Sequence, residues 1–145
     1  MTRLPQACAV PYRRGADGPR FLLITNRKGQ WILPKGIIDP GETARETALK
    51  EAFEEAGVRG TIAGPAIARY SYEKWGCLCE VEAFLLLVES EEPDWPEREV
   101  RDRGWFGFAE ARAAVRRKLT LVLDRAEEAL RILPSPPAGS SSPAR

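Results

Sequence analysis

The chain has 145 residues, 43% of them hydrophobic and 30% charged, a composition typical of one globular domain with its own core. Its formal net charge is +1, so overall charge gives no reason to expect a membrane surface or a nucleic acid as partner. The sequence contains no histidine, which excludes a His-ligated zinc site and a Ser-His catalytic triad.

The amino-terminal third predicts short strands separated by turns. Strands are expected at 7–11, 21–25 and 31–33, with glycine-containing turns between them. The tripeptide Asp39-Pro40-Gly41 predicts a further turn, because proline presets φ and glycine accepts a left-handed conformation. The amino terminus lacks a continuous apolar segment, so we expect no secretory signal and a cytoplasmic location.

A helix is predicted to follow this turn and to end near residue 56. Thr43 is its expected N-cap, Glu46 completes a capping box, and Gly57 is expected to end the helix. An apolar stripe on the helix is expected to face the core. It consists of Ala48, Leu49, Ala52, Phe53 and Ala56.

Three glutamates share another face of this helix. At about 100° per residue, the side chains of Glu51, Glu54 and Glu55 fall within an arc of roughly 100°. Like charges at this spacing repel one another by a few tenths of a kcal/mol per pair. An ordinary solvated face is the alternative, but the nearby Arg45 and Lys50 do not project into this arc. Because a hard divalent cation would reverse the repulsion, we interpret the segment as a metal site.

The second half of the chain predicts further strands and a terminal helix. Strands are expected at 58–62, 66–72, 77–88 and 105–108, and 77–88 has the apolar run of a central strand. A charged loop covers 89–103. Apolar residues at helical spacing predict an amphipathic helix from Leu119 to Leu133, ended by Pro134. The Pro/Ser-rich segment 134–145 is predicted to be a disordered tail, which leaves 1–133 as the domain.

Residues 36–58 resemble the Nudix box. The pattern of that family is G-x5-E-x7-R-E-U-x-E-E-x-G-U, with U a bulky apolar residue, and the chain matches it from Gly36 through Glu42 to the run KEAFEEAGV. Two positions depart from the pattern, since Lys50 replaces the arginine and Ala52 is small for its apolar position. Lysine offers a point charge instead of a planar fork, so we expect Lys50 to hold its carboxylate partner, which we take to be Glu42, less rigidly. A P-loop is rejected because Glu42 stands where its lysine is required.

The resemblance implies a Nudix-type α/β fold, an α/β/α sandwich with a mixed β-sheet between helices. It also implies a hydrolase that cleaves a phosphoanhydride (diphosphate) bond with Mg²⁺ or Mn²⁺ as cofactor. Carried over by position, Glu51, Glu55 and the carbonyl of Gly36 would bind the metal, and Glu54 would orient or deprotonate the attacking water. Some members take this base from a later loop, where Glu97 or Glu99 stand here. Which of the three glutamates acts as the base stays open.

A second local similarity predicts the class of substrate. The segment WILPKG at 31–36 resembles Nudix branches that act on diadenosine polyphosphates and diphosphoinositol polyphosphates. Arg27, Lys28 and Lys35 are the basic residues predicted to bind such a small polyphosphate. Aromatic residues that could stack on a base are Tyr70, Tyr72, Trp75 and Trp95. We expect no membrane or nucleic acid partner and leave the oligomeric state open. The alternatives are an inert nucleotide-sensing module and a hydrolase of nucleotide sugars or RNA 5′ ends.

Overall fold

Two long strands, β1 (Thr2–Gly15) and β7 (Cys77–Glu91), pair in parallel at the centre of an eight-stranded mixed sheet. In the computed structural model, residues 1–132 are described, so the predicted tail and Leu133 lie outside the described residues. The other strands pair antiparallel with these two or with their neighbours. They are β2 (Gly18–Thr25), β3 (Trp31–Ile32), β4 (Lys35–Ile37), β5 (Val58–Ile62), β6 (Ala68–Lys74) and β8 (Arg103–Gly107).

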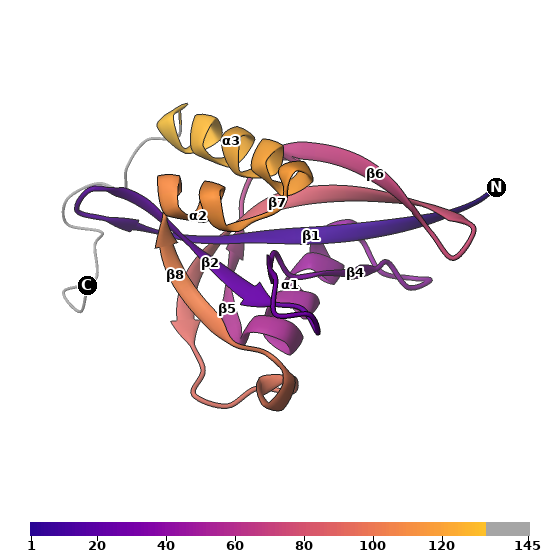
Figure 1. The fold of residues 1–145 in the computed structure, drawn as a ribbon, viewed down its shortest axis with the longest axis horizontal. Coiled ribbons are helices and arrows are strands. Elements are labelled where there is room, and N and C mark those ends of the chain that lie inside the picture. Colours follow the sequence, from indigo (N-terminus) through magenta and orange to yellow (C-terminus); the bar gives the residue numbers. More distant parts are fainter. Residues whose placement is uncertain (133–145) are drawn as a thin grey trace.

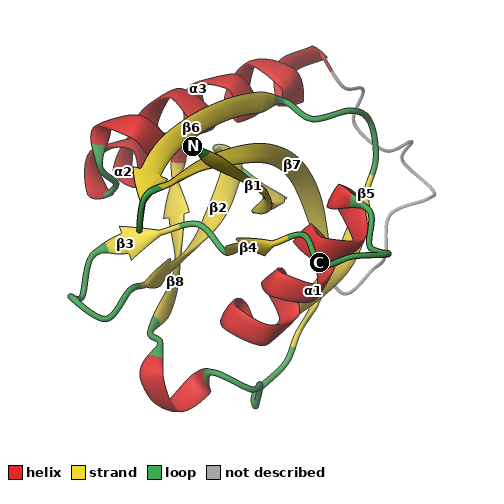
Figure 2. Ribbon diagram, turned by 90° about the vertical axis from the view of Figure 1, so that its right-hand side faces the viewer, coloured by secondary structure: helices red, strands yellow, loops and turns green. Residues whose placement is uncertain are grey.

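Helices cover both faces of this sheet (Figures 1 and 2). Helix α1 (Ala44–Ala56) packs on one face, and α2 (Phe108–Ala114) with α3 (Arg117–Ile132) packs on the other. Strand β1 shows why both faces are buried, because Ala7 and Ala9 face the α1 side whereas Cys8 and Val10 face the α3 side. The predicted α/β/α sandwich with a mixed sheet is therefore confirmed.

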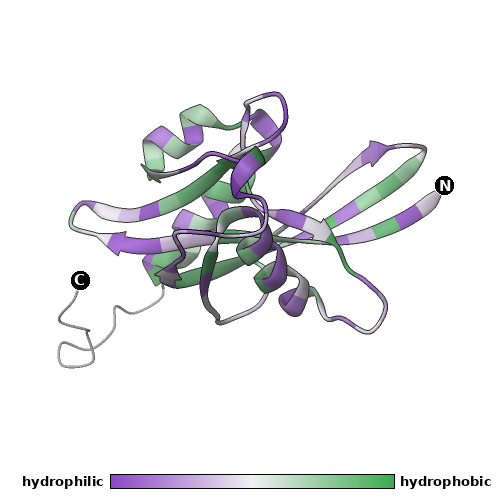
Figure 3. Ribbon diagram, turned by 90° about the horizontal axis from the view of Figure 1, so that it is seen from below, coloured by the Kyte–Doolittle hydropathy of each residue, from purple (hydrophilic) through white to green (hydrophobic). Residues whose placement is uncertain are grey.

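The colouring by hydropathy agrees with this layering. Seen from below, green hydrophobic segments lie along the strands, and purple hydrophilic ones recur in the helices and loops (Figure 3). Amphipathic elements of this kind bury one face against the sheet and leave the other in water. Among the described residues, no helix is long and apolar enough to cross a membrane.

Several element predictions need correction. Strand β4 and helix α2 were not predicted, because each is too short to show a period of its own. Phe108 begins α2 instead of ending the preceding strand. Leu49 is not a core residue, being 36% exposed, whereas Thr47 is buried in its place. The buried stripe of α1 consists mainly of alanines, which let the helix lie close to the sheet.

Candidate active site

Helix α1 has both of its predicted caps. The hydroxyl of Thr43 accepts a hydrogen bond from the backbone N–H of Glu46, and the Glu46 carboxylate accepts one from the N–H of Thr43. At the other end, Gly57 adopts φ 70°, a left-handed conformation that glycine adopts without steric cost. The caps fix where the helix starts and stops, and they therefore fix which glutamates face β4.

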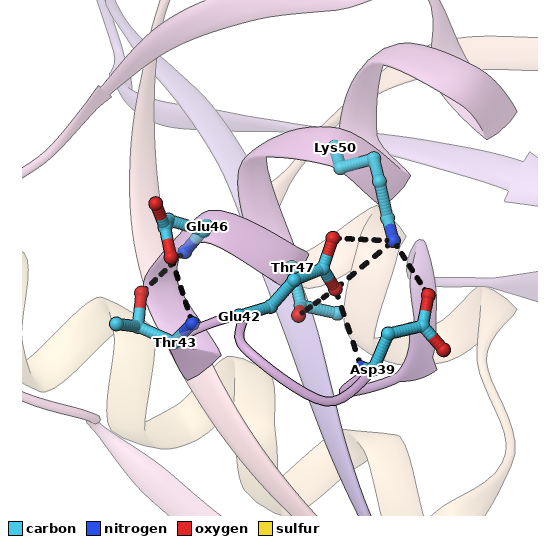
Figure 4. A network of polar contacts seen from close by, with 6 residues as sticks. All are labelled: Asp39, Glu42, Thr43, Glu46, Thr47 and Lys50. Carbon is cyan, nitrogen blue, oxygen red and sulfur yellow. Dashed lines mark hydrogen bonds and ion pairs between the residues drawn. The ribbon is translucent and has the colours of Figure 1, made fainter.

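Lys50 ties the segment before the helix to the helix itself (Figure 4). Its ammonium group lies 2.8 Å from Oε2 of Glu42 and 3.2 Å from Oδ2 of Asp39. The Thr47 hydroxyl donates a third hydrogen bond, to Oε1 of Glu42, at 2.9 Å. The bond from Lys50 is the main cause of a lowered pKa at Glu42. The expected pairing of Lys50 with Glu42 is confirmed, and Lys50 also holds Asp39.

Gly36 and Glu51 are in close contact. Strand β4 runs beside α1, and a Cβ atom added to Gly36 would lie 2.3 Å from Cδ of Glu51. No side chain fits at this position unless Glu51 moves. The glycine that begins the box thus leaves room for the carboxyl group of Glu51, which lies directly against its backbone.

Glu55 is the most buried of the three clustered glutamates, with 8% of its surface exposed. Its Oε1 accepts a hydrogen bond from the backbone N–H of Lys35 at 3.1 Å, and its Oε2 lies 3.4 Å from Nη2 of Arg101. Arg101 was not predicted as a site residue. Its Nε also lies 2.9 Å from Oε1 of Glu97, so the loop before β8 brings one cation and one carboxylate to Glu55.

The two loop candidates for the base are placed differently. The backbone N–H of Glu97 donates to the carbonyl of Glu54 at 3.0 Å, which places Glu97 beside the end of α1. Glu99 is exposed in the short 3-10 turn Arg98–Val100. Glu54 itself is half-buried. The position of Glu97 beside α1 favours it over Glu99 as the alternative to Glu54, and which of the three glutamates is the base stays a prediction.

The carboxylates are short of positive charge. Burial raises the pKa of Glu55 to about 8, partly offset by Arg101 and reinforced by Glu51. Burial also raises the pKa of Glu51, partly offset by a hydrogen bond with Glu55, and the charge of Glu54 adds to the rise. Among residues 1–132, Asp, Glu and Cys side chains nowhere gather in a ready-made group of three. A divalent cation held by Glu51, Glu55 and the Gly36 carbonyl fits these oxygen donors and their missing charge.

A pH dependence of stability follows from the position of Glu55. Its pKa is about 8 in the folded chain and near 4.5 otherwise, so between these values the folded state retains a proton that the unfolded state releases. The free energy of unfolding of the metal-free protein is therefore expected to fall as pH rises from 4.5 to 8. Melting curves in chelator across this range will measure the slope. Glu55→Gln should flatten it, and an equally steep slope in that variant would contradict the assignment.

Basic residues line a cavity of about 810 Å³ beside Glu55. They come from the turn after β2, from β4, from β6, from the loop before β8 and from the start of α3. They are Arg27, Lys28, Lys35, Lys74, Arg101, Arg116, Arg117 and Lys118. The structure thus brings together Arg27, Lys28 and Lys35, whose binding role stays a prediction. The Arg-Arg-Lys run at 116–118 was missed, although three adjacent cations at a helix start were a readable signal.

Tyr72 holds two of these cations in the cavity. Its hydroxyl accepts a hydrogen bond from Nζ of Lys35 at 2.7 Å and donates one to Oε1 of Gln6 at 2.8 Å. The ammonium group of Lys118 lies 4.4 Å from the centre of the same ring. Tyr70 lies beside Tyr72, with ring centres 6.4 Å apart. Lys35 and Lys118 therefore meet at one aromatic ring although they come from opposite parts of the chain.

Two of the four candidate aromatic residues, Trp75 and Trp95, lie outside the lining of the cavity. Trp75 is 79% exposed at the turn between β6 and β7, and Trp95 packs beside the end of α1. The guanidinium of Arg13 lies over Trp105, at 4.1 Å from its ring centre, and Arg20 donates a hydrogen bond to the Trp105 carbonyl. None of these residues is on the lining of the cavity, although the ammonium group of the cavity residue Lys74 lies 4.3 Å from the centre of the Trp75 ring.

Comparison with known proteins places this geometry in context. A family model described as NUDIX domain matches residues 2–126. Nudix hydrolase 16, mitochondrial, from Arabidopsis thaliana is 36% identical over 101 residues, which cover 63% of this chain and 56% of the relative. The chain therefore spans about half of the length of that relative.

Solved structures resemble the fold over nearly the whole described chain. A Caenorhabditis elegans Ap4A hydrolase binary complex aligns with a TM-score of 0.75 and 25% identity, covering 90% of this chain and 99% of that one. The NUDIX domain of Shewanella oneidensis NrtR, complexed with ADP ribose, aligns with a TM-score of 0.73 and 18% identity, covering 90% of each chain. The second likeness concerns the fold alone.

Proposed function

The chain belongs to the Nudix family, and on this premise we propose that it is a divalent-metal-dependent hydrolase that cleaves a phosphoanhydride bond in a small polyphosphate. One observation carries the proposal. The cavity lined by eight basic residues opens onto Glu55, which lies one helical turn after Glu51, and the Glu51 carboxyl group lies against the backbone of Gly36. Residues suited to phosphate oxygens and residues suited to a divalent cation therefore meet at one place.

The acidic side of the site would hold the cation. Glu51, Glu55 and the carbonyl of Gly36 are the proposed ligands, and Mg²⁺ or Mn²⁺ suits such oxygen donors. A bound divalent cation supplies neutralisation of charge on phosphate oxygens and lowers the pKa of water. The Lys50–Glu42 pair would keep the segment that carries Gly36 in place against α1.

The remaining steps fall to side chains of the protein. Glu54, or Glu97 beside it, would take a proton from the attacking water. The water oxygen bonds to phosphorus, the bridging P–O bond breaks, and the leaving phosphate takes the electron pair. Lys35, held by Tyr72, would bind non-bridging oxygens next to the reacting centre.

The basic residues that line the cavity favour a substrate with several phosphates. Arg101 is paired with Glu55 and Glu97, but the other seven cations of the cavity create a positive field that a molecule with one or two phosphates would leave largely unpaired. We place diadenosine polyphosphates and diphosphoinositol polyphosphates ahead of nucleotide sugars. The C. elegans structural neighbour is an Ap4A hydrolase, in keeping with this order. The cations lie in a cavity and not along an open stripe, which favours a small molecule over an RNA.

A hydrolysis screen with Mg²⁺ or Mn²⁺, which detects nucleotide and sugar phosphate products as well as inorganic phosphate, tests the proposal. It should include dinucleoside polyphosphates, inositol pyrophosphates, nucleotide sugars and nucleoside triphosphates, with product identification to locate the attacked phosphorus. We expect the phosphoanhydride bonds of polyphosphate-rich substrates to be cleaved. Failure to hydrolyse any of them with either metal would refute the proposal.

Lys118→Gln tests whether the basic residues of the cavity bind the substrate. This exposed lysine lies at the cavity, so its loss should raise KM for the best substrate by up to about fivefold with little change in kcat. Arg131→Gln is the matched control, because Arg131 is on the same helix but pairs with Glu127 outside the cavity. Equal KM values in the two variants would remove Lys118 from the binding site.

A further inference from the structure

The last turn of α1 is capped by a loop that is distant in sequence. An α-helix leaves its last four carbonyl groups without partners inside the helix. In α1 each of these four carbonyls accepts a hydrogen bond, at 2.9 to 3.1 Å. Three of the donors come from the segment 95–103. In order from Phe53 to Ala56, the donors are the N–H of Gly57, the N–H of Glu97, the indole N–H of Trp95 and Nη1 of Arg103.

Arg103 and Trp95 form one packed unit at this helix end. The last turn of α1 carries no basic residue, so Arg103 of β8 supplies the positive charge that a helix C-terminus favours. Its guanidinium lies 3.9 Å from the centre of the Trp95 ring and donates a second hydrogen bond to the carbonyl of Glu92, at 2.7 Å. A Cβ atom on Gly57 would lie 2.6 Å from Arg103 and 2.7 Å from Trp95, so the pair packs directly on the glycine.

The loop that carries Trp95 contacts both the backbone and the side chain of Glu55. The indole of Trp95 binds the backbone carbonyl of Glu55, at 3.1 Å. Arg101, six residues further along the same loop, lies against the Glu55 carboxylate and also pairs with Glu97. The loop therefore sets both the main chain and the side chain of a residue that faces the cavity.

We propose that Trp95 and Arg103 are positioning residues that set the metal affinity of the site through the last turn of α1. The proposal rests on the proposed metal site at Glu51 and Glu55. Loss of the Trp95 cap would free the carbonyl of Glu55, and loss of the Arg103 cap would free that of Ala56. Either loss would let this turn fray and allow the Glu55 carboxylate to move away from the backbone N–H of Lys35.

Trp95→Phe tests the proposal directly. Phenylalanine keeps an aromatic ring under Arg103 but removes the indole N–H donor. Mn²⁺ affinity of the substrate-free protein, measured by calorimetry and by the electron paramagnetic resonance of free Mn²⁺, should fall about threefold to tenfold. Trp75→Phe is the matched control, since Trp75 is 79% exposed at a hairpin turn, and its Mn²⁺ affinity should equal that of the wild type.

Arg103→Lys is a second, independent variant. Lysine keeps the positive charge at the helix end but cannot bind the Ala56 and Glu92 carbonyls with one rigid fork, so Mn²⁺ affinity should again fall. If Trp95→Phe does not fold, the Mn²⁺ affinity of Arg103→Lys tests the proposal on its own. A merely structural role would lower the melting temperature of both variants and leave Mn²⁺ affinity unchanged, which would overturn the proposal.

The same measurements separate this proposal from the proposed function. If the wild type binds Mn²⁺ but hydrolyses no substrate in the screen, the proposed function fails. The Mn²⁺ affinities of the variants would still show whether Trp95 and Arg103 position the metal site. If the wild type hydrolyses and both variants bind Mn²⁺ as tightly, the positioning proposal alone fails. A wild type that binds no divalent cation overturns both.

Discussion

Glu54→Gln is expected to lower kcat by about 10²-fold or more while leaving the fold and Mn²⁺ affinity close to those of the wild type. Glutamine keeps the size of the side chain but cannot accept the proton from the attacking water. Glu54 is not one of the proposed metal ligands, and its side chain is half-buried near Glu51 and Glu55. Steady-state kinetics at saturating Mn²⁺, with a parallel Mn²⁺ titration, will separate a lost base from a lost ligand.

The kcat of Glu97→Gln must be measured together with that of Glu54→Gln. The backbone N–H of Glu97 bonds to the Glu54 carbonyl, so the two carboxylates lie at the same end of α1 and either could receive the proton. Glu128→Gln on α3 is the control, because Glu128 is exposed on a helix that covers the other face of the sheet. A large loss in Glu97→Gln with near-normal turnover in Glu54→Gln would assign the base to Glu97. Near-normal turnover in both would remove each from that role.

The sequence predicted the acidic half of the site because its residues are local. Capping at Thr43 and Gly57 needs a span of a few residues, and the contact of Lys50 with Glu42 lies within one helix and the turn before it. The box spacing likewise placed Glu51 and Glu55 on one side of α1. Within one helix, side-chain direction follows from the helical period alone.

The other half of the site depends on pairings between distant segments. Arg101 meets Glu55, and Arg103 meets the carbonyl of Ala56, because β8 pairs with β2 and carries the preceding loop to the end of α1. Lys118 reaches the Tyr72 ring because α3 packs over the face of the sheet that includes β6. No spacing in the sequence encodes these contacts, since sheet order and helix packing decide them.

Gly36→Ala should reduce Mn²⁺ affinity and kcat/KM by about 10²-fold, because a single methyl group takes the place of the Glu51 carboxylate. The added Cβ would lie 2.3 Å from Cδ of Glu51 and 2.5 Å from its Oε2. Gly36 does not have a positive φ, so alanine suits the backbone and the whole effect comes from this contact. The atoms that the added Cβ meets are the far end of a flexible side chain, so we expect Glu51 to turn away at little cost in stability and the metal site to lose its carboxylate.

A double-mutant cycle shows whether the Glu51 carboxylate is the group displaced. Glu51→Ala alone should lose Mn²⁺ affinity without a clash, and adding Gly36→Ala to Glu51→Ala should lower that affinity no further, because the carboxylate that the methyl group displaces is already gone. Mn²⁺ affinity should stay low in the double variant, because the proposed ligand is gone. Melting temperatures and Mn²⁺ titrations of all four proteins complete the cycle. Tight Mn²⁺ binding by Gly36→Ala would mean that the cation does not need Glu51 in its present place, and the assignment of Glu51 as a ligand would then be wrong.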